Sequence, residues 1–234
     1  MREFHIEKTL PSVDVDLQLI SLLDNYIHSE LEILTNNWEK ASSNLSRISI
    51  IDHLGKETVE SSGELRNASL SNTTFNISIE KLRENIETKE FISVEMVFDK
   101  KKYYSNIEIK CAGENCRVVT MGLHEGILNI LQGYKNHNSL LFLPTSFEML
   151  FFGVIVGMLA IAFIKVEAGK ISITIPLVIL TCLSILFFAR VNFPYIHFVG
   201  KRNTAIRNAY MWLISGILGT IIFTYLFPIL LDFF

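Results

Sequence analysis

Three long apolar runs near the C-terminus constrain this chain more than any other feature. They cover about residues 146–164, 171–189 and 209–231. Each is close to the ~20 apolar residues that cross ~30 Å of hydrocarbon as a helix. One such run also suits a buried core helix, but three in so short a stretch favour a membrane. We therefore expect a water-soluble domain at residues 1–139, followed by a three-helix transmembrane module at residues 140–234.

The cations between these runs predict the orientation of the module. The loop between the first two runs holds Lys165 and Lys170, and Lys135 precedes the first run. The second loop holds four cations: Arg190, Lys201, Arg202 and Arg207. Three spans place the N-terminal domain and the second loop on one side, with five cations against two. Because cytoplasmic loops are rich in Lys and Arg, we expect a multi-pass protein of the cell membrane with a cytoplasmic N-terminal domain. The C-terminus then lies on the opposite side.

The charge of the soluble part argues against nucleic-acid binding. The chain carries −3 in total and residues 146–234 carry +3, so residues 1–145 carry −6. Phosphate contacts supply most of the affinity for nucleic acids, and an acidic surface repels them. The basic run Lys100–Lys102 is interpreted as a solvated hairpin tip. Residues 1–16 do not have the apolar core of a signal peptide, so no secretory signal is expected.

The hydrophobic pattern of residues 1–139 predicts an α+β domain with a mainly antiparallel sheet. An apolar stripe from Ile20 to Trp38 predicts a helix at residues 13–40 with Ser12 as its N-cap. A helix packed on a sheet is one interpretation of this stripe, and a self-associating coiled coil is the other. Alternating residues predict strands at 47–52, 57–61, 74–79, 91–98, 103–110 and 117–121. Further helices are expected at residues 80–88 and 123–134. Such a sheet would have one face covered by helices.

The cysteines do not predict a metal site. Cys111 and Cys116 flank a four-residue turn, and in a cytosolic domain we expect them to be free thiols. Their spacing is not typical of zinc, and no second pair completes a site. The four Asn-x-Ser/Thr sequons matter only outside the cytoplasm; they begin at Asn44, Asn67, Asn72 and Asn76.

No catalytic motif is recognisable, so we expect no enzyme and no cofactor. Glycine-rich phosphate loops and nucleophile elbows are absent from the sequence. His124-Glu125 begins like a zinc-protease motif, but residue 128 is Leu. We expect this pair at a strand-to-helix turn, with a solvated or capping role favoured over ligand contact. The apolar runs have no charge near their centres, which disfavours a proton-coupled carrier.

Small residues in the apolar runs predict close helix packing. Gly153, Gly157 and Ala160 share one face of the first span, and Gly216 and Gly219 lie in the third. Small residues let helices approach in lipid. The contact is expected either within one chain or between chains. Aromatic and basic residues of the second loop are expected at the membrane interface: Arg190, Phe193, Tyr195, Lys201, Arg202 and Arg207.

Three functions remain compatible with this organisation. The first is a sensor–effector, in which the cytosolic domain binds a ligand or protein partner and controls an oligomeric membrane module that perturbs the membrane. The second is an anchoring or scaffold subunit of a larger complex. The third, a membrane-bound enzyme, is disfavoured. The expected partners are membrane lipids, further copies of the chain or a membrane complex, and a soluble protein that binds the N-terminal domain.

Overall fold

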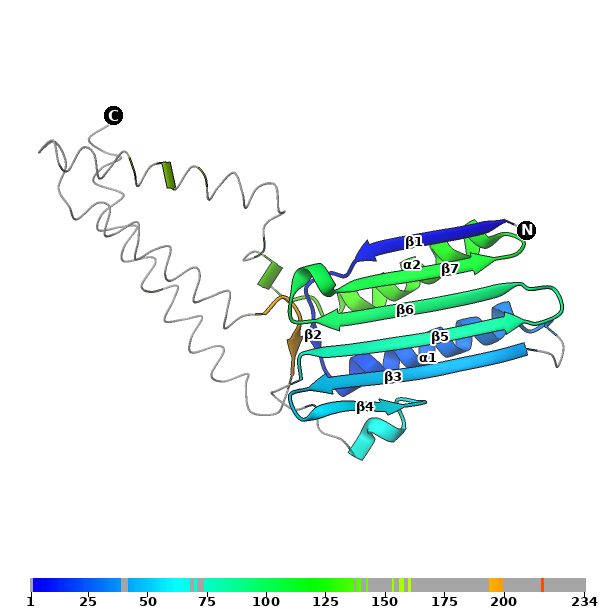
Figure 1. The fold of residues 1–234 in the computed structure, drawn as a ribbon, viewed down its shortest axis with the longest axis horizontal. Coiled ribbons are helices and arrows are strands. Elements are labelled where there is room, and N and C mark those ends of the chain that lie inside the picture. Colours follow the sequence, from blue (N-terminus) through cyan, green and yellow to red (C-terminus); the bar gives the residue numbers. More distant parts are fainter. Residues whose placement is uncertain are drawn as a thin grey trace, which may run out of the picture. The chain divides into compact units, whose positions relative to one another are not determined.

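The N-terminal part of the chain folds into an antiparallel sheet with two helices packed on one face, as the computed structural model shows (Figure 1). The structure describes residues 2–38, 42–67, 70, 74–136, 138–139, 142, 153, 156–157, 160, 194–199 and 216. The chain divides into two compact units. One comprises Met1–Ser139 and Pro194–Gly200, and the other comprises Leu140–Phe193 and Lys201–Phe234. The α+β class expected for the N-terminal domain is therefore confirmed.

Most of the three predicted spans lies outside the described residues. Only five isolated positions in them are described: Gly153, Val156, Gly157, Ala160 and Gly216. In the described part of the chain, no helix combines the length and the apolar character needed to cross a bilayer.

The sheet has six strands in the order β1-β7-β6-β5-β3-β4, and every neighbouring pair is antiparallel. Its strands are β1 (Glu3–Thr9), β3 (Ser42–Asp52), β4 (Gly55–Val59), β5 (Asn76–Asn85), β6 (Phe91–Asp99) and β7 (Asn106–Ala112). Two short 3-10 turns, η1 (Glu64–Asn67) and η2 (Lys102–Tyr104), lie in the connections. The first strand of the chain thus pairs with the last strand of the sheet, and β1 and β4 form its edges.

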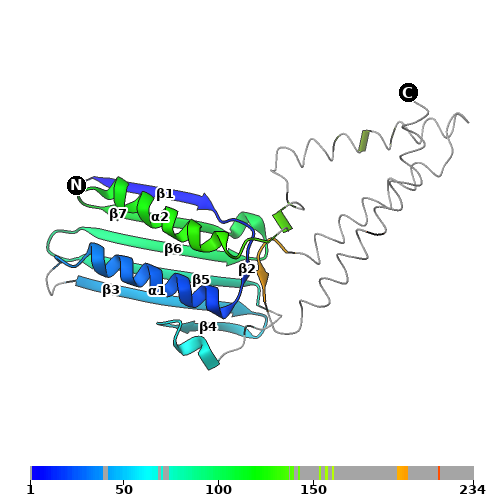
Figure 2. The ribbon, with the colours of Figure 1, turned by 180° about the vertical axis from the view of Figure 1, so that it is seen from behind.

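Two helices, α1 (Leu17–Leu34) and α2 (Cys116–Gln132), cover the same face of the sheet (Figure 2). On α1 the buried side chains include Leu19, Leu23 and Ile27, and on α2 they include Leu123 and Ile127. These positions recur every four residues, which places them on one helical face. The sheet contributes alternate residues to the same core: Ile48, Ile77, Ile79, Val94, Met96, Phe98, Ile107 and Ile109. The opposite face of the sheet carries no helix among the described residues.

The first helix is shorter than the sequence pattern predicts. It begins after Asp16, whose carboxylate accepts a hydrogen bond from the Leu19 amide at 2.7 Å, so the N-cap is Asp16 and not Ser12. An aspartate in this position satisfies an amide that has no partner within the helix. The helix ends at Leu34, and Trp38 lies beyond it, half-buried.

Two predicted elements are wrong. Residues 80–88, expected as a helix, belong largely to β5, which pairs with β3 on one side and β6 on the other. These two ladders satisfy the backbone of β5, which outweighs the helical spacing of Leu82 and Ile86. Residues 117–121, expected as a strand, form the first turns of α2. Val118 and Met121 are exposed there, whereas Cys116, Thr120 and Leu123 are buried on one helical face.

The N-terminal residues also form a strand that the sequence did not predict. Along β1, Phe4 and Ile6 are half-buried, whereas Glu3, His5 and Glu7 beside them are exposed. This alternation is typical of an edge strand with one covered face. The charged residues of β1 made the segment look like a polar tail.

Candidate functional site: the β2–β8 junction

A segment from the predicted second loop is built into the N-terminal unit. Strand β8 (His197–Phe198) pairs in parallel with β2 (Asp14–Val15), with Asp14 opposite His197 and Val15 opposite Phe198. The amides of His197 and Val199 donate to the carbonyls of Val13 and Val15 at 3.1 and 2.8 Å. Residues 140–193 separate this segment from the rest of its unit. The N-terminal unit is therefore completed by a distant part of the chain.

The side chains of this segment are almost fully buried. Ile196 is 0% exposed and Phe198 4%, while Leu10, Val13 and Val15 on the facing segment are equally inaccessible. These residues bring apolar surface from two distant parts of the chain into one core. Burying each large aliphatic side chain stabilises such an arrangement by about 1.5–3 kcal/mol. The segment is therefore held by packing as well as by backbone hydrogen bonds.

Tyr195 anchors the segment to two other parts of the unit. Its amide donates to the Lys100 carbonyl at 3.1 Å, and its hydroxyl donates to the Leu10 carbonyl at 2.8 Å. Burial raises the pKa of Tyr195, so the hydroxyl stays protonated as a donor. The Ser12 hydroxyl lies 2.5 Å from the Tyr195 carbonyl. Such a buried polar contact is costly to break without replacing the partner.

A polar network joins β8 to the end of α2. Asp14 accepts from the Asn136 side-chain amide at 2.9 Å, and its carboxylate lies 3.5 Å from Nδ1 of His197. The Asn138 side-chain amide donates to the Pro194 carbonyl at 2.9 Å. Because α2 ends at Gln132, this network lies immediately beyond its C-terminus. One cluster thus connects three separate stretches of sequence.

Backbone hydrogen bonds tie the same stretches together. The Asp14 amide donates to the Tyr134 carbonyl at 2.9 Å, and the Asn136 amide donates to the Ser12 carbonyl at 3.1 Å. We call residues 10–15, 134–136, 138 and 194–199 together the β2–β8 junction. The chain passes to the other unit after Ser139 and returns before Pro194. The junction therefore lies next to the points where the two units are covalently connected.

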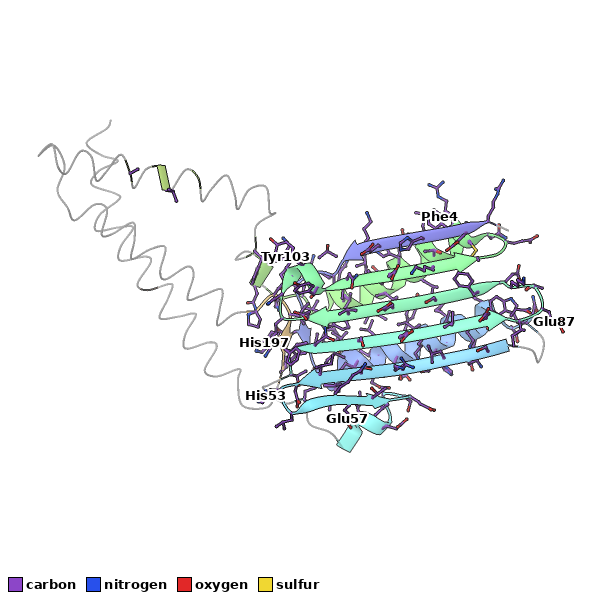
Figure 3. The ribbon with its side chains drawn as sticks, viewed as in Figure 1. Phe4, His53, Glu57, Glu87, Tyr103 and His197 are labelled. Atoms are coloured by element: carbon purple, nitrogen blue, oxygen red, sulfur yellow. A yellow bond between two sulfur atoms is a disulfide. The ribbon has the colours of Figure 1, made fainter. Side chains whose placement is uncertain are left out.

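The ends of the sheet are distinguishable by the residues they carry. In Figure 3, His197 and Tyr103 lie at one end of the sheet, whereas Phe4 and Glu87 lie at the other. Phe4 is paired with Cys111. The junction and the cysteine pair described below are therefore at opposite ends of the N-terminal unit.

The uncovered face of the sheet carries a row of acidic residues. Glu7, Glu108, Glu95 and Glu80 are direct cross-strand neighbours on β1, β7, β6 and β5. Arg47 on β3 continues the row opposite Glu80. We call these four glutamates the glutamate row. Like charges directly opposite each other destabilise a sheet, so this arrangement opposes folding.

Neighbouring groups set the protonation of the glutamate row. Burial raises the pKa of Glu95, and the charges of Glu108 and Glu80 raise it further. The pKa of Glu108 is lowered, mainly by a hydrogen bond from Lys110, whose ammonium lies 2.7 Å from its carboxylate. Glu95 forms no ion pair with any described residue. Glu95 is the member of the row whose pKa the neighbouring glutamates raise, and the charge of Lys110 opposes that rise only in part.

A buried ion pair ties α1 to the sheet. The Lys81 ammonium lies 2.6 Å from the Asp24 carboxylate, and both side chains are 6% exposed. Asp24 also accepts from the Ser62 amide at 2.9 Å, while Lys81 donates to the Ser46 hydroxyl at 3.2 Å. Burial alone would raise the pKa of Asp24, but the bonds from Lys81 and Ser62 outweigh it and lower that pKa. Both charges are thus satisfied within the protein.

The prediction of free thiols is wrong, because Cys111 and Cys116 form a disulfide. Cys111 lies near the end of β7 and Cys116 is the first residue of α2. Gly113 (φ 149°) and Asn115 (φ 55°) turn the intervening loop sharply enough to bring the two Cα atoms within 5.3 Å. This separation is ordinary for a disulfide. The bond pins the start of α2 to the sheet.

The residues predicted to pack in the membrane or line its surface are mostly undescribed. Gly153, Gly157, Ala160 and Gly216 lie in helical backbone and are exposed. Gly219 lies outside the described residues, and so do Arg190, Phe193, Lys201, Arg202 and Arg207. Tyr195, grouped with them by the sequence, belongs to the junction. Close packing at the glycines and an interfacial role for the second loop stay predictions.

His124 and Glu125 lie in the middle of α2, and not at a turn as predicted. Burial, together with the charge of Lys8, lowers the pKa of His124. No described residue bonds to its Nε2 atom. The described residues contain no group of three potential metal ligands.

Sequence reasoning missed the residues that make up the junction. Asp14, Asn136 and His197 are far apart in sequence and belong to no motif. The one available signal was the run Tyr195–Phe198, in which three bulky apolar residues interrupt a polar loop. A packed core and a bilayer both select apolar residues, so this run predicts a membrane-facing segment as readily as a buried one. Comparisons with protein-family models, with curated proteins and with solved structures find no match for this chain.

Proposed function

We propose that this protein is a membrane-anchored sensor–effector. In this proposal the N-terminal unit lies in the cytoplasm and binds a ligand or protein partner. The three apolar runs form a transmembrane module that oligomerises through the face of Gly153, Gly157 and Ala160 and perturbs the membrane. The β2–β8 junction transmits the state of the N-terminal unit to the transmembrane module.

The observation that carries the proposal is the pairing of β8 with β2. A simple anchor needs only one covalent connection to its soluble domain. Here the segment between the second and third predicted spans is held inside the N-terminal unit by three amide hydrogen bonds, at Tyr195, His197 and Val199. Any change in the unit that weakens this pairing alters the constraint on both flanking spans. Coupling of this kind requires an element with two arrangements whose balance depends on both the N-terminal unit and the transmembrane module. The proposed element is β8, either paired with β2 or released from it.

The junction is suited to release because its pairing is short. β2 and β8 share only two residue pairs, whereas β3 and β5 share ten. Local opening occurs most readily where few backbone bonds and little packing must be broken. A ligand of the N-terminal unit needs only to bind one of the two states more tightly in order to shift their populations.

The proposal is tested by disrupting the junction in the full-length protein. Replacing Ile196 with Asp places a carboxylate in a site that is 0% exposed, which separates β8 from β2 because an unpaired buried charge is strongly unfavourable. Expression of this variant should change the membrane potential of cells in comparison with wild type, measured with a voltage-sensitive dye. Leu54→Asp is the matched control, since Leu54 is 88% exposed on the same unit.

Three further results bear on the proposal. Gly157→Ile, added to Ile196→Asp, should abolish the change in membrane potential that Ile196→Asp causes, and the protein should stay in the membrane. A branched side chain separates helices packed at a glycine face. Identical potentials for Ile196→Asp, Leu54→Asp and wild type would contradict coupling through the junction. The proposed orientation is tested with a reporter that works only in the cytosol, fused after Phe234. Activity of this reporter would contradict the orientation.

The glutamate row favours a second candidate function, that of a scaffold subunit. A row of like charges that opposes folding is compatible with a cationic protein partner covering the sheet face. Purification in mild detergent would distinguish the two. The scaffold is supported if a partner co-purifies with Glu84→Gln but not with Glu95→Gln. It also requires that Ile196→Asp has no effect on membrane potential.

A further inference from the structure

The disulfide between Cys111 and Cys116 has no part in the function proposed above. Both residues are buried, at 3% and 4% exposure. Cys111 is held on both sides in the sheet, opposite Phe4 on β1 and Ile92 on β6. Cys116 belongs to α2 alone. The bond is thus a single covalent clamp between the sheet and the start of that helix.

The loop that joins the two cysteines lies at the surface. Its backbone is fixed by a hydrogen bond of 3.1 Å from the Gly113 amide to the Arg2 carbonyl. An open pocket of about 440 Å³ adjoins it, lined by Arg2, Thr88, Glu90, Gly113, Glu114 and Asn115. This volume is enough for a small peptide-sized thiol. A small thiol in this pocket would lie beside the loop, and the loop has to open before the thiol reaches the two buried sulfur atoms.

Helix α2 connects the clamp to the junction. It has 17 residues, which corresponds to a length of about 25 Å. Cys116 is its first residue, and Tyr134 and Asn136, just beyond its last, bond to the junction residues Asp14 and Ser12. The helix also packs along β1 and β7, as Figure 2 shows. Helix α2 is thus the element through which a shift at the clamp would reach the junction.

We propose that Cys111 and Cys116 are a reversible thiol–disulfide switch whose oxidation state sets the stability of the β2–β8 pairing through α2. The proposal rests on the cytosolic position of the N-terminal unit, because disulfides in the reducing cytosol are mostly catalytic or redox-sensing. In the oxidised form the start of α2 is clamped and β8 stays paired. In the reduced form α2 is held only by packing, and β8 is released more often.

The chemistry requires two equivalents of a small thiol such as glutathione. The thiolate of the first attacks Sγ of Cys111, forms a mixed disulfide there and expels the Cys116 thiolate. The positive end of the α2 dipole stabilises that thiolate as a leaving group. A second thiolate attacks the sulfur of the small thiol in the mixed disulfide and expels Cys111. The protein gains two electrons and two protons, and the small thiol leaves as its own disulfide.

The switch is tested on full-length protein in mild detergent, equilibrated in buffers of increasing ratio of reduced to oxidised glutathione. Alkylation with a heavy maleimide reports the oxidation state of the pair. Hydrogen–deuterium exchange reports the junction through the amides of His197 and Val199. Reduction should accelerate exchange of both amides by on the order of tenfold, within the usual range of coupling between two sites.

Two variants provide controls. Cys111→Ser/Cys116→Ser cannot form the clamp and should exchange like the reduced protein at every ratio. Cys182→Ser removes the remaining cysteine of the chain and should respond like wild type. If the double variant does not fold, the comparison of oxidised with reduced wild type still tests the switch.

Several outcomes would overturn the switch. One is a pair that stays oxidised at the most reducing glutathione ratio. Another is reduction that leaves exchange at His197 and Val199 unchanged. Full oxidation of the pair in intact, unstressed cells, measured by rapid acid quenching and alkylation, would also overturn it. The exchange measurement needs no membrane activity, so a protein that never alters membrane potential fails the proposed function and leaves the switch standing.

Discussion

Asp24 and Lys81 are the residues whose energetics the structure constrains most sharply. Asp24→Asn leaves the Lys81 ammonium buried without a compensating charge, and breaking such a pair costs about 3–5 kcal/mol. The double change Asp24→Leu/Lys81→Met removes both charges and should cost much less. Chemical denaturation of the full-length protein in detergent, followed by tryptophan fluorescence, measures the difference. Equal losses for the single and double variants would show that the pair is not coupled.

The same pair gives a pH dependence with a defined sign. Because the pKa of Asp24 is lowered in the folded protein, its contribution is fully present above the ordinary aspartate value. It is lost as the pH falls through the folded value. Wild type should therefore lose stability more steeply than Asp24→Leu/Lys81→Met once the pH falls below the ordinary aspartate pKa of 3.8. Denaturation midpoints of the two proteins that run parallel down to pH 3 would contradict this.

Glu95 is expected to destabilise the fold at neutral pH. Its pKa is raised by burial and by Glu108 and Glu80, so its contribution falls as the pH rises through that value. Glu95→Gln should increase the free energy of unfolding by about 0.2–1 kcal/mol, the range for cross-strand pairs. Glu84→Gln is the control, because Glu84 faces Phe91 and not another glutamate. Thermal melts at pH 7 test this, and a less stable Glu95→Gln would count against a repulsive row.

At the scale of single residues, sequence reasoning found the core better than the polar groups. The apolar positions of α1 follow from spacing alone, since Ile20, Leu23 and Ile27 recur on one face. Lys81 did not follow, because it occupies an inward position of β5 that the alternation rule assigns to an apolar residue. Its partner lies 57 positions earlier in the chain, and no local pattern connects the two. The disulfide was missed for another reason. The expected cytosolic location predicts free thiols, whatever the spacing of the two cysteines.

Among the elements, α1 offers a direct test of where a helix begins. Asp16→Ala removes the side-chain acceptor of the Leu19 amide and should lower the free energy of unfolding by about 0.5–2 kcal/mol. Gln18→Ala is a matched control in the same turn, because Gln18 is exposed and Ala favours the helix. Denaturant titration compares the two. A loss for Gln18→Ala as large as that for Asp16→Ala would argue against the cap.

The elements that were predicted correctly have strong local patterns. β6 and β7 alternate half-buried and buried residues almost without exception, and the predicted bounds of both lie within a few residues of the observed ones. β5 and α2 were misassigned where local and tertiary signals conflict. In β5 the helical spacing of Leu82 and Ile86 is outweighed by pairing with two strands, β3 and β6. In α2 the β-branched pair Val118-Val119 lost to the burial of Cys116, Thr120 and Leu123 on one helical face.

At the scale of the whole molecule, the N-terminal unit is not a continuous stretch of sequence. Residues 1–139 contain all of the six-stranded sheet and both helices, and most of this could be read from pattern, though not β1, the second half of β5 or the start of α2. The contribution of Pro194–Gly200 could not, because its apolar residues lie between two predicted spans and match a membrane interface equally well. Only the paired backbone of β2 and β8 distinguishes the two.

This organisation predicts that residues 1–139 alone are less stable than the unit in the full chain. Without residues 194–199, β2 has no partner strand and Leu10, Val13 and Val15 lose the segment that helps to cover them. A synthetic peptide of residues 191–203 should raise the melting temperature of the 1–139 fragment in a concentration-dependent manner, as any ligand of the folded state does. The same peptide with Ile196→Asp is the control. No shift with the unmodified peptide would mean that the segment is not part of the fold.

The central claim is that β8 is an integral strand of the N-terminal unit, and hydrogen exchange of the intact protein tests it most directly. The amides of Tyr195, His197 and Val199 donate to Lys100, Val13 and Val15. In full-length protein in nanodiscs under oxidising conditions, these three amides should exchange far more slowly than those of an unstructured peptide of the same sequence. Exchange of all three at the rate of the unstructured peptide would contradict the account.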